Sequence, residues 1–301
     1  MNVDMVLTYL DFVVDRHRVW ELRQAGQPQH WSADPILQRN KFTNIYRVLD
    51  YGSQFLLREL LDEPGIGPED ALARSFLYRM SNEPATWQHT KAQWGLYPRA
   101  HNFTDDLGKL WADYRDAGNR VFSGAYTIMP LPGVGGFDKA REVVRMADAA
   151  CHPDSPTNVI EAFRYAPTMQ ERFAVLRGIP NVGDFIAMQV LTDFGYSRFG
   201  ADQDENDFVV PGPGARKGAK ELFPDKKAAW VIQWCREQVL QLPDCPMVQG
   251  RPPSLMDIQN TLCEFSKYAR FMRQPEPARV FKPLHPGRAV PPVLPQHWLT
   301  A

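Results

Sequence analysis

The chain has 301 residues, of which 44% are hydrophobic and 12% aromatic, so it can bury a sizeable core and its composition excludes a disordered protein. Its 34 Lys and Arg nearly balance 35 Asp and Glu, giving a net charge of −1, so a nucleic-acid partner would need a local basic surface. No apolar run is long enough for a membrane span, and acidic residues interrupt the apolar N-terminal segment, which argues against a secretory signal. The four cysteines are scattered and form no metal-ligating motif, so we expect no metal site, no cofactor and a reducing compartment.

Apolar residues at helical spacing predict helices along most of the chain, whereas the alternation typical of strands is weak. We expect helices over residues 3–14, 42–60, 68–80, 105–116, 138–150, 169–177, 184–194, 226–241 and 257–272. The segment 274–301 contains seven prolines and is basic, which predicts an extended tail. The sequence therefore predicts a mainly α fold, with a helical catalytic domain over residues 1–273 followed by the tail.

Two of the expected helices carry polar stripes. In the helix over 42–60, the stripe consists of Thr43, Arg47, Asp50 and Gln54, which are spaced to share one face. In the helix over 257–272, a polar stripe runs beside the apolar one and consists of Asp257, Asn260, Glu264 and Lys267. Each stripe has two interpretations: part of a site, or a solvated face with ordinary ion pairs.

Residues 179–183 (IPNVG), followed by Ala187, predict the hairpin of a helix-hairpin-helix near 169–194. Such a hairpin presents backbone N–H groups to a DNA phosphate, here from Asn181, Val182 and Gly183. Asn181 stands where a glycine is usual, and asparagine tolerates the left-handed conformation that the turn needs. A second match, residues 131–135 (LPGVG), lacks the acidic cluster downstream. Either match could instead be a simple corner between helices.

An acidic cluster and a basic segment follow the hairpin. The cluster contains Asp202, Asp204, Glu205 and Asp207. Because apolar residues 208–210 come next, we expect Asp207 to be half-buried, with a raised pKa that suits a general base; the alternative is an exposed loop. Residues 211–218 predict a stiff turn that presents Arg216 and Lys217 as phosphate-binding cations. This turn lacks the Gly-x-x-x-x-Gly-Lys-Ser/Thr pattern of a nucleotide-phosphate loop, so we do not expect a kinase.

Four segments together resemble a known family. They are residues 31–37 (WSADPIL), 42–50 (FTNIYRVLD), 204–215 (DENDFVVPGPGA) and 257–268 (DIQNTLCEFSKY). They are similar to the alpha-glutamyl/putrescinyl thymine pyrophosphorylases of bacteriophages, which are related to the helical domain of hydroxymethyluracil DNA kinases. The resemblance covers most of residues 30–270.

The resemblance implies a DNA-glycosylase-like helical fold and a transferase that hypermodifies thymine bases by base flipping. A separate kinase first phosphorylates hydroxymethyluracil in double-stranded DNA, and this enzyme then replaces the phosphate or pyrophosphate with an amine or amino acid. It implies action in the cytoplasm of the infected bacterial host, without a membrane. The chemistry needs a base, cations for the leaving phosphate and a group that binds the donor. We expect Asp207 and Glu264, with Asn260 and Lys267, to provide the base. Arg216 and Lys217 would bind the leaving phosphate, and Arg47 with Asp50 would bind the donor. A base-excision glycosylase and a non-catalytic DNA-binding module are the alternatives.

Overall fold

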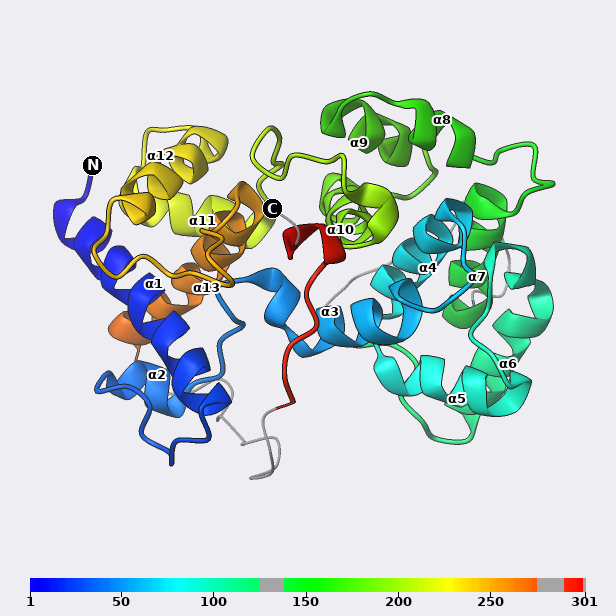
Figure 1. Ribbon diagram of the computed structural model, residues 1–301, viewed down its shortest axis with the longest axis horizontal. Helices are drawn as coiled ribbons and strands as arrows, with labels where there is room; N and C mark the ends of the chain where they lie inside the picture. Colours follow the sequence, from blue (N-terminus) through cyan, green and yellow to red (C-terminus); the bar gives the residue numbers. More distant parts are fainter. Residues whose placement is uncertain (125–137, 275–289, 300–301) are drawn as a thin grey trace. The chain divides into compact units, whose positions relative to one another are not determined.

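The computed structural model describes residues 1–124, 138–274 and 290–299 (Figure 1). The chain divides into two compact units, one built from residues 1–50 and 205–293 and the other from residues 51–204 and 294–301. Secondary structure in the described residues is helical, apart from isolated bridge residues such as the pair Val248 and Arg251. This confirms the expected mainly α fold.

The first unit is built around α13. Its helices are α1 (Val3–Gln24), α2 (Pro35–Arg39), the 3-10 turn η1 (Arg47–Leu49), α11 (Pro213–Leu222), α12 (Ala228–Leu240) and α13 (Leu255–Arg273). Helix α1 packs on α13 through Tyr9, whose ring meets that of Phe265 edge-on at 5.2 Å and whose hydroxyl lies 2.6 Å from Thr261 Oγ1. Ser254 caps α13 and exchanges hydrogen bonds with Asp257, so this helix begins at a defined residue.

Helices α11 and α13 approach closely because glycines face α13. A Cβ atom on Gly218 would overlap the carbonyl oxygen of Leu262, and one on Gly214 would overlap the side chain of Cys263. Residues 211–218 are therefore not the stiff turn expected from their glycines and prolines. Gly212 is the N-cap of α11, and Pro213 occupies its first turn, where a proline loses no hydrogen bond.

Replacing Gly218 by alanine should destabilise the first unit by about 1–3 kcal/mol, because the backbone of α13 cannot move aside as a flexible side chain could. Gly124→Ala is a suitable control, since a Cβ there meets nothing within 4 Å. Chemical denaturation of the two variants measures the difference. Equal stability of Gly218→Ala and the wild type would show that the helices are not in such close contact.

The second unit is formed around α4 (Pro68–Ser81), which packs against α7 (Lys139–Cys151) and α10 (Asp184–Gly195). Arg79 of α4 donates two hydrogen bonds of 2.6 Å to the carboxylate of Asp193 on α10, and both side chains are buried. The remaining elements are α3 (Tyr51–Phe55), the π-helix η2 (Leu56–Leu61), α5 (Pro84–Trp94), η3 (Ala100–Asn102), α6 (Asp105–Asp116), α8 (Ile160–Tyr165), α9 (Met169–Arg177), η4 (Arg198–Gly200) and η5 (Gln296–Trp298).

Within the expected tail, residues 290–299 are described. Trp298 is buried in the second unit, where its ring meets that of Tyr196 edge-on at 6.1 Å. Whether the tail acts as a separate region, and whether residues 1–273 form one catalytic domain, stay predictions.

Most expected helices are present, but the one over residues 42–60 is present only in its second half. Residues 42–46 are irregular and η1 is a single 3-10 turn, whereas α3 and the π-helix η2 follow each other without a break. The carboxylates of Glu264 and Asp257 accept the backbone N–H groups of Thr43 and Arg47, so these two donors bond to α13 and not to a helix of their own. The apolar residues of segment 42–60 have the spacing of one helix, but they do not share one face. Those before residue 50 are buried in the first unit, and those after it are buried in the second.

Candidate functional site

Residues 179–183 form a tight turn between α9 and α10, as expected. Asn181 has a φ of 62°, the left-handed conformation that asparagine tolerates, and the N–H of Val182 donates to the carbonyl of Ile179 at 3.1 Å. Gly183 is the N-cap of α10. That this turn acts as a DNA-binding helix-hairpin-helix stays a prediction, and the second match at 131–135 lies outside the described residues.

In the first unit, α13 and the segment 41–50 bring several predicted site residues together. Glu264 Oε2 accepts the N–H of Thr43 at 2.9 Å and receives a hydrogen bond of 2.7 Å from Lys267 Nζ. Asn260 Nδ2 donates to the carbonyl of Asn44 at 2.9 Å, and Lys267 Nζ also donates to the carbonyl of Lys41 at 2.7 Å. The polar stripe of α13 is therefore not a solvated face, because it holds the segment 41–50 in place.

Arg47 and Asp257 form the inner part of this cluster. Arg47 is only 7% exposed, and its backbone N–H donates to Asp257 Oδ1 at 2.9 Å. The other oxygen of Asp257 accepts both the N–H and the hydroxyl of Ser254. Burial raises the pKa of Asp257, and these hydrogen bonds oppose that rise. Asp257 therefore joins the cap of α13 to the segment that carries Arg47.

Asp50 is the titrating group at the centre of the cluster. Its Oδ1 accepts the N–H of Asn44 at 2.8 Å, and Arg16 Nη2 donates to Asn44 Oδ1 at 2.8 Å. Burial raises the pKa of Asp50 from 3.8 to about 6, although the N–H of Asn44 and the charges of Arg47 and Arg16 favour the ionised form. Asp50 therefore titrates close to physiological pH, which is characteristic of groups that exchange protons in sites.

This pKa predicts how stability depends on pH. Because the folded state binds the proton of Asp50 more tightly than the unfolded chain, protonation stabilises the fold below pH 3.8, and that stabilisation is lost as the pH rises through about 6. Asp50→Asn removes the titration. The free energy of unfolding of the wild type, minus that of Asp50→Asn, should fall by on the order of 2 kcal/mol between pH 3.5 and 7.5, a window set by the two pKa values. Urea denaturation of both proteins at the two pH values measures it, and a rise would contradict the prediction.

The acidic cluster 202–207 differs from its expected form. Asp207 is exposed, not half-buried, and it makes no hydrogen bond or ion pair with any residue that the structure describes. The buried acid of the segment is Glu205, which pairs with Arg251 at 3.0 Å, while Asp202 pairs with Arg172 in the second unit. Asp202 and Glu205 are thus paired with separate arginines. The expected burial of Asp207 is wrong because Phe208, Val209 and Val210 are themselves only half-buried.

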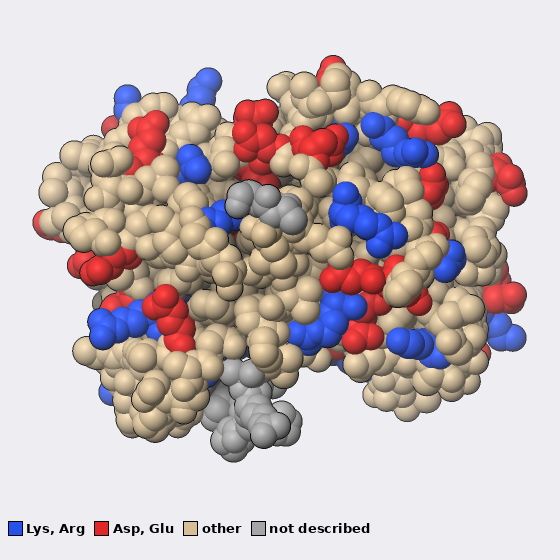
Figure 2. Space-filling model, in the orientation of Figure 1, with Lys and Arg blue, Asp and Glu red and all other residues tan. Residues whose placement is uncertain are grey.

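Arg216 and Lys217 are exposed in the first turns of α11. The charge of Lys217 acts on the thiol of Cys263, as do those of Glu264 and Lys267, so Lys217 belongs to the surroundings of the α13 cluster. No hydrogen bond or ion pair among the described residues links Arg216 or Asp207 to that cluster. On the face shown in Figure 2, basic and acidic groups are interspersed, and no continuous basic surface is visible.

Sequence reasoning missed two contributors to the cluster, Arg16 and Asn44. Arg16 follows Val13 by three positions and is buried on the same face of α1, so a charged residue within the apolar spacing was the available signal. Asn44 lies in the segment that we wrongly expected to be helical. No local sequence pattern predicts its hydrogen bonds to Asp50, Leu49 and Arg16. Gln54 of the expected stripe belongs to the other unit.

The comparison with known proteins identifies the family. Residues 3–277 match the model of the helical domain of 5-hmdU DNA kinases, and the chain belongs to this family. It is similar to the 5-hmdU DNA kinase of Bacillus phage SP10, with 25% identity over 237 residues, which cover 72% of this chain and 36% of that protein. The chain therefore corresponds to about a third of the length of that relative. No solved structure matches.

Two further observations concern the described residues alone. No group of three or more His, Cys, Asp or Glu side chains among them could hold a metal ion. None of their helices combines the length and the apolar character needed to cross a bilayer.

Proposed function

We propose that the protein is a DNA-modifying transferase that replaces the phosphate or pyrophosphate of phosphorylated hydroxymethyluracil with an amine or amino acid. The observation that carries this proposal is its membership of the 5-hmdU kinase helical-domain family. In the proposed sequence a separate kinase phosphorylates the base, and this protein acts afterwards. The resemblance to the alpha-glutamyl/putrescinyl thymine pyrophosphorylases supports the later step.

In the proposed reaction, the amine nitrogen of the donor attacks the methylene carbon on the base, and the carbon–oxygen bond to the phosphate breaks. The leaving phosphate takes the bonding electrons, and the ammonium formed loses a proton to a base. The target base must first leave the helical stack, which costs a few kcal/mol. The protein thus has to supply phosphate contacts, a base and a donor site.

We assign these roles to described residues. Asp207 is the first candidate for the base, because it is exposed and no partner occupies its carboxylate. Glu264 is the second, and Lys267 and Asn260 hold it and its neighbouring segment. Arg216 and Lys217 bind the leaving phosphate. Arg47 with Asp50 is the candidate for binding the carboxylate of an amino-acid donor; Arg47 is buried, and its charge opposes the rise in the pKa of Asp50.

The turn over 179–183 is proposed to contact the DNA backbone through its amides, within a glycosylase-like helical fold. The test of the function is mass spectrometry of nucleosides, after incubation of the protein with phosphorylated hydroxymethyluracil DNA and amine or amino-acid donors. A new aminated nucleoside supports the transferase. An abasic site would indicate a base-excision glycosylase, and binding without any change would indicate a non-catalytic DNA-binding module.

DNA affinity should fall as salt rises, despite the net charge of −1, because the proposed contacts are to phosphates. Lys217→Glu should weaken binding and reduce the salt dependence, since it removes one phosphate contact and adds repulsion. Lys109→Glu is the control, because Lys109 is also exposed but lies on α6, outside both α11 and the turn over 179–183. Fluorescence anisotropy of labelled DNA at several salt concentrations measures both effects, and an affinity independent of salt would argue against a nucleic-acid partner.

A further inference from the structure

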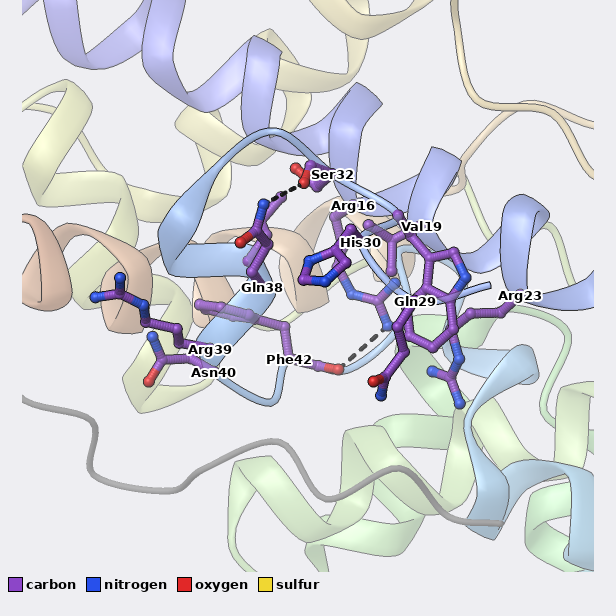
Figure 3. Close-up of a pocket in the computed structure, with 12 residues that line it drawn as sticks. Arg16, Val19, Arg23, Gln29, His30, Ser32, Gln38, Arg39, Asn40 and Phe42 are labelled. Carbon is purple, nitrogen blue, oxygen red and sulfur yellow. Dashed lines mark hydrogen bonds between the residues drawn. The ribbon is translucent and has the colours of Figure 1, made fainter. Parts of the chain in front are cut away.

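A cavity of about 440 Å³ lies within the first unit, between α1, the loop that follows it and α2. Figure 3 shows Arg23 and Gln29 at one end of its lining and Arg39 at the other, with His30 between them. Its volume falls in the range of sites for small-molecule ligands. None of the site residues expected from the sequence is among the described residues that line it, so the cavity is a further candidate site.

The charges around the cavity favour an anion. Arg16, Arg23 and Arg39 bring three guanidinium groups, and no aspartate or glutamate is among the described residues of the lining. Burial lowers the pKa of Arg16 to about 10, so this side chain stays charged at neutral pH. A cavity lined by charges of one sign raises the local concentration of ligands of the opposite sign. The buried Arg16 contributes its charge, and direct contacts with a ligand fall to the less buried Arg23 and Arg39.

The end of the cavity at Arg23 suits a flat aromatic ring. Arg23 lies over the indole of Trp31, with its guanidinium carbon 5.3 Å from the ring centroid. Nucleobases stack on aromatic side chains and on the planes of arginine guanidinium groups. The amide of Gln29 and the imidazole of His30 are exposed, and neither makes a hydrogen bond or ion pair with a residue that the structure describes. Together these groups can take the ring and the polar edge of a base.

The opposite end of the cavity has a group for a phosphate. Arg39 is the last residue of α2, is exposed, and bonds to no side chain in the described part of the chain. A guanidinium group binds phosphate oxygens through parallel hydrogen bonds. Gln38 Nε2 donates to the carbonyl of Ser32 at 2.7 Å, which ties α2 to the preceding loop. This wall of the cavity is therefore formed before any ligand arrives.

His30 has an unusual backbone conformation. Its φ is 82°, in the left-handed region that residues other than glycine rarely adopt. Such strained conformations persist where the surrounding structure holds them, and they concentrate at ligand sites. The loop thus places the imidazole in the lining at a cost in backbone energy. Glycine at this position would remove the ring and relieve the strain, which separates an effect on binding from an effect on folding.

We infer that this cavity binds a nucleoside monophosphate, with the base at the Arg23 end and the phosphate on Arg39. The inference goes beyond the proposed function, because no residue assigned to the transfer reaction lines the cavity. A free nucleotide and the 5′-phosphorylated end of a DNA strand carry the same chemistry. The experiment therefore includes both sources.

Isothermal titration calorimetry of the full chain tests the inference, with thymidine 5′-monophosphate, deoxyadenosine 5′-monophosphate, the two nucleosides and inorganic phosphate as separate probes. We expect saturable binding of one or both monophosphates, and at least tenfold weaker binding of the nucleosides and of phosphate, because each of these lacks one half of the ligand. Competition with a single-stranded oligonucleotide identifies the source. Displacement by the 5′-phosphorylated strand, but not by the same strand without its phosphate, assigns the site to a DNA end, and no displacement by either assigns it to a free nucleotide.

Three variants locate the binding. Arg39→Glu should reduce the affinity for the monophosphate at least tenfold, to that of the nucleoside, because only the phosphate contact is lost. His30→Gly should weaken monophosphate binding at least threefold without lowering the melting temperature, since it removes the ring and the backbone strain together. Arg18→Glu is the control that matches the charge change, an exposed arginine on α1 outside the lining.

Equal affinities for the monophosphates and inorganic phosphate would overturn the inference, because they would show a site for any small anion. Unchanged monophosphate binding by Arg39→Glu and His30→Gly in folded proteins would also overturn it. The test uses neither modified DNA nor an amine donor. Its failure therefore leaves the proposed transferase standing, and an absence of aminated nucleoside in the mass-spectrometric assay leaves the cavity standing.

Discussion

Asp207→Asn should reduce turnover on phosphorylated hydroxymethyluracil DNA by about 10²–10⁴-fold, because the amide cannot take the proton that the donor nitrogen loses. DNA affinity should stay within a few-fold, since the substitution removes a base and no phosphate contact. The fold should be unaffected, because the side chain is exposed and bonds to no described residue. Single-turnover formation of the aminated nucleoside, measured beside DNA binding, separates the two effects.

Asp225→Asn is the matched control. Asp225 is another exposed aspartate of the first unit, in the turn between α11 and α12, and it has no role in the proposed chemistry. Full activity of Asp207→Asn would remove Asp207 as the base and leave Glu264 as the candidate. Because Glu264 also accepts hydrogen bonds from Thr43 and Lys267, its glutamine variant has to be checked for stability first.

Arg79→Met should lower the free energy of unfolding of the second unit by about 3–5 kcal/mol, because it leaves the buried carboxylate of Asp193 without its cation. The double variant Arg79→Met with Asp193→Leu should recover much of that loss, since neither position then leaves an unpaired buried charge. Urea denaturation followed by circular dichroism measures the three proteins.

Arg115→Met serves as the control for this pair. Arg115 also binds a carboxylate through two nitrogens, that of Asp138, but the two side chains are 40% and 26% exposed. Solvent and salt screen such a pair, so its loss should cost less than about 1 kcal/mol. Similar losses for Arg79→Met and Arg115→Met would show that burial does not set the strength of these ion pairs.

Local signals in the sequence account for much of the fold. Helices α6 and α9 have the expected bounds because each begins after a threonine and carries its own apolar face. The pattern could not reveal that Thr43 and Arg47 bond to carboxylates on α13, more than 200 positions away. It also could not show that Gly214 and Gly218 are needed for close helix packing, because glycines and prolines equally predict a turn.

The candidate site was predictable in its residue types and less so in its arrangement. Asn260, Glu264 and Lys267 were found because one helix carries them at regular spacing. The sequence did not reveal Arg16, or the cavity that α1, the loop after it and α2 line, because both depend on how α1 and that loop pack. The predicted burial of Asp207 was wrong, because apolar neighbours in sequence do not bury a side chain when they are themselves half-buried.

The division of the first unit into residues 1–50 and 205–293 has a consequence for synthesis of the chain. Helix α1 leaves the ribosome before the other elements of this unit, and α13, which packs on it through Phe265, is made more than 200 residues later. At elongation rates of about 5–20 residues per second, the apolar face of α1 waits for roughly 10–50 seconds. Most of the second unit is one continuous stretch, residues 51–204, and can fold during that delay. The first unit can therefore close only after residues 51–204 have been made, and the second unit receives its last element, η5 with Trp298, later still.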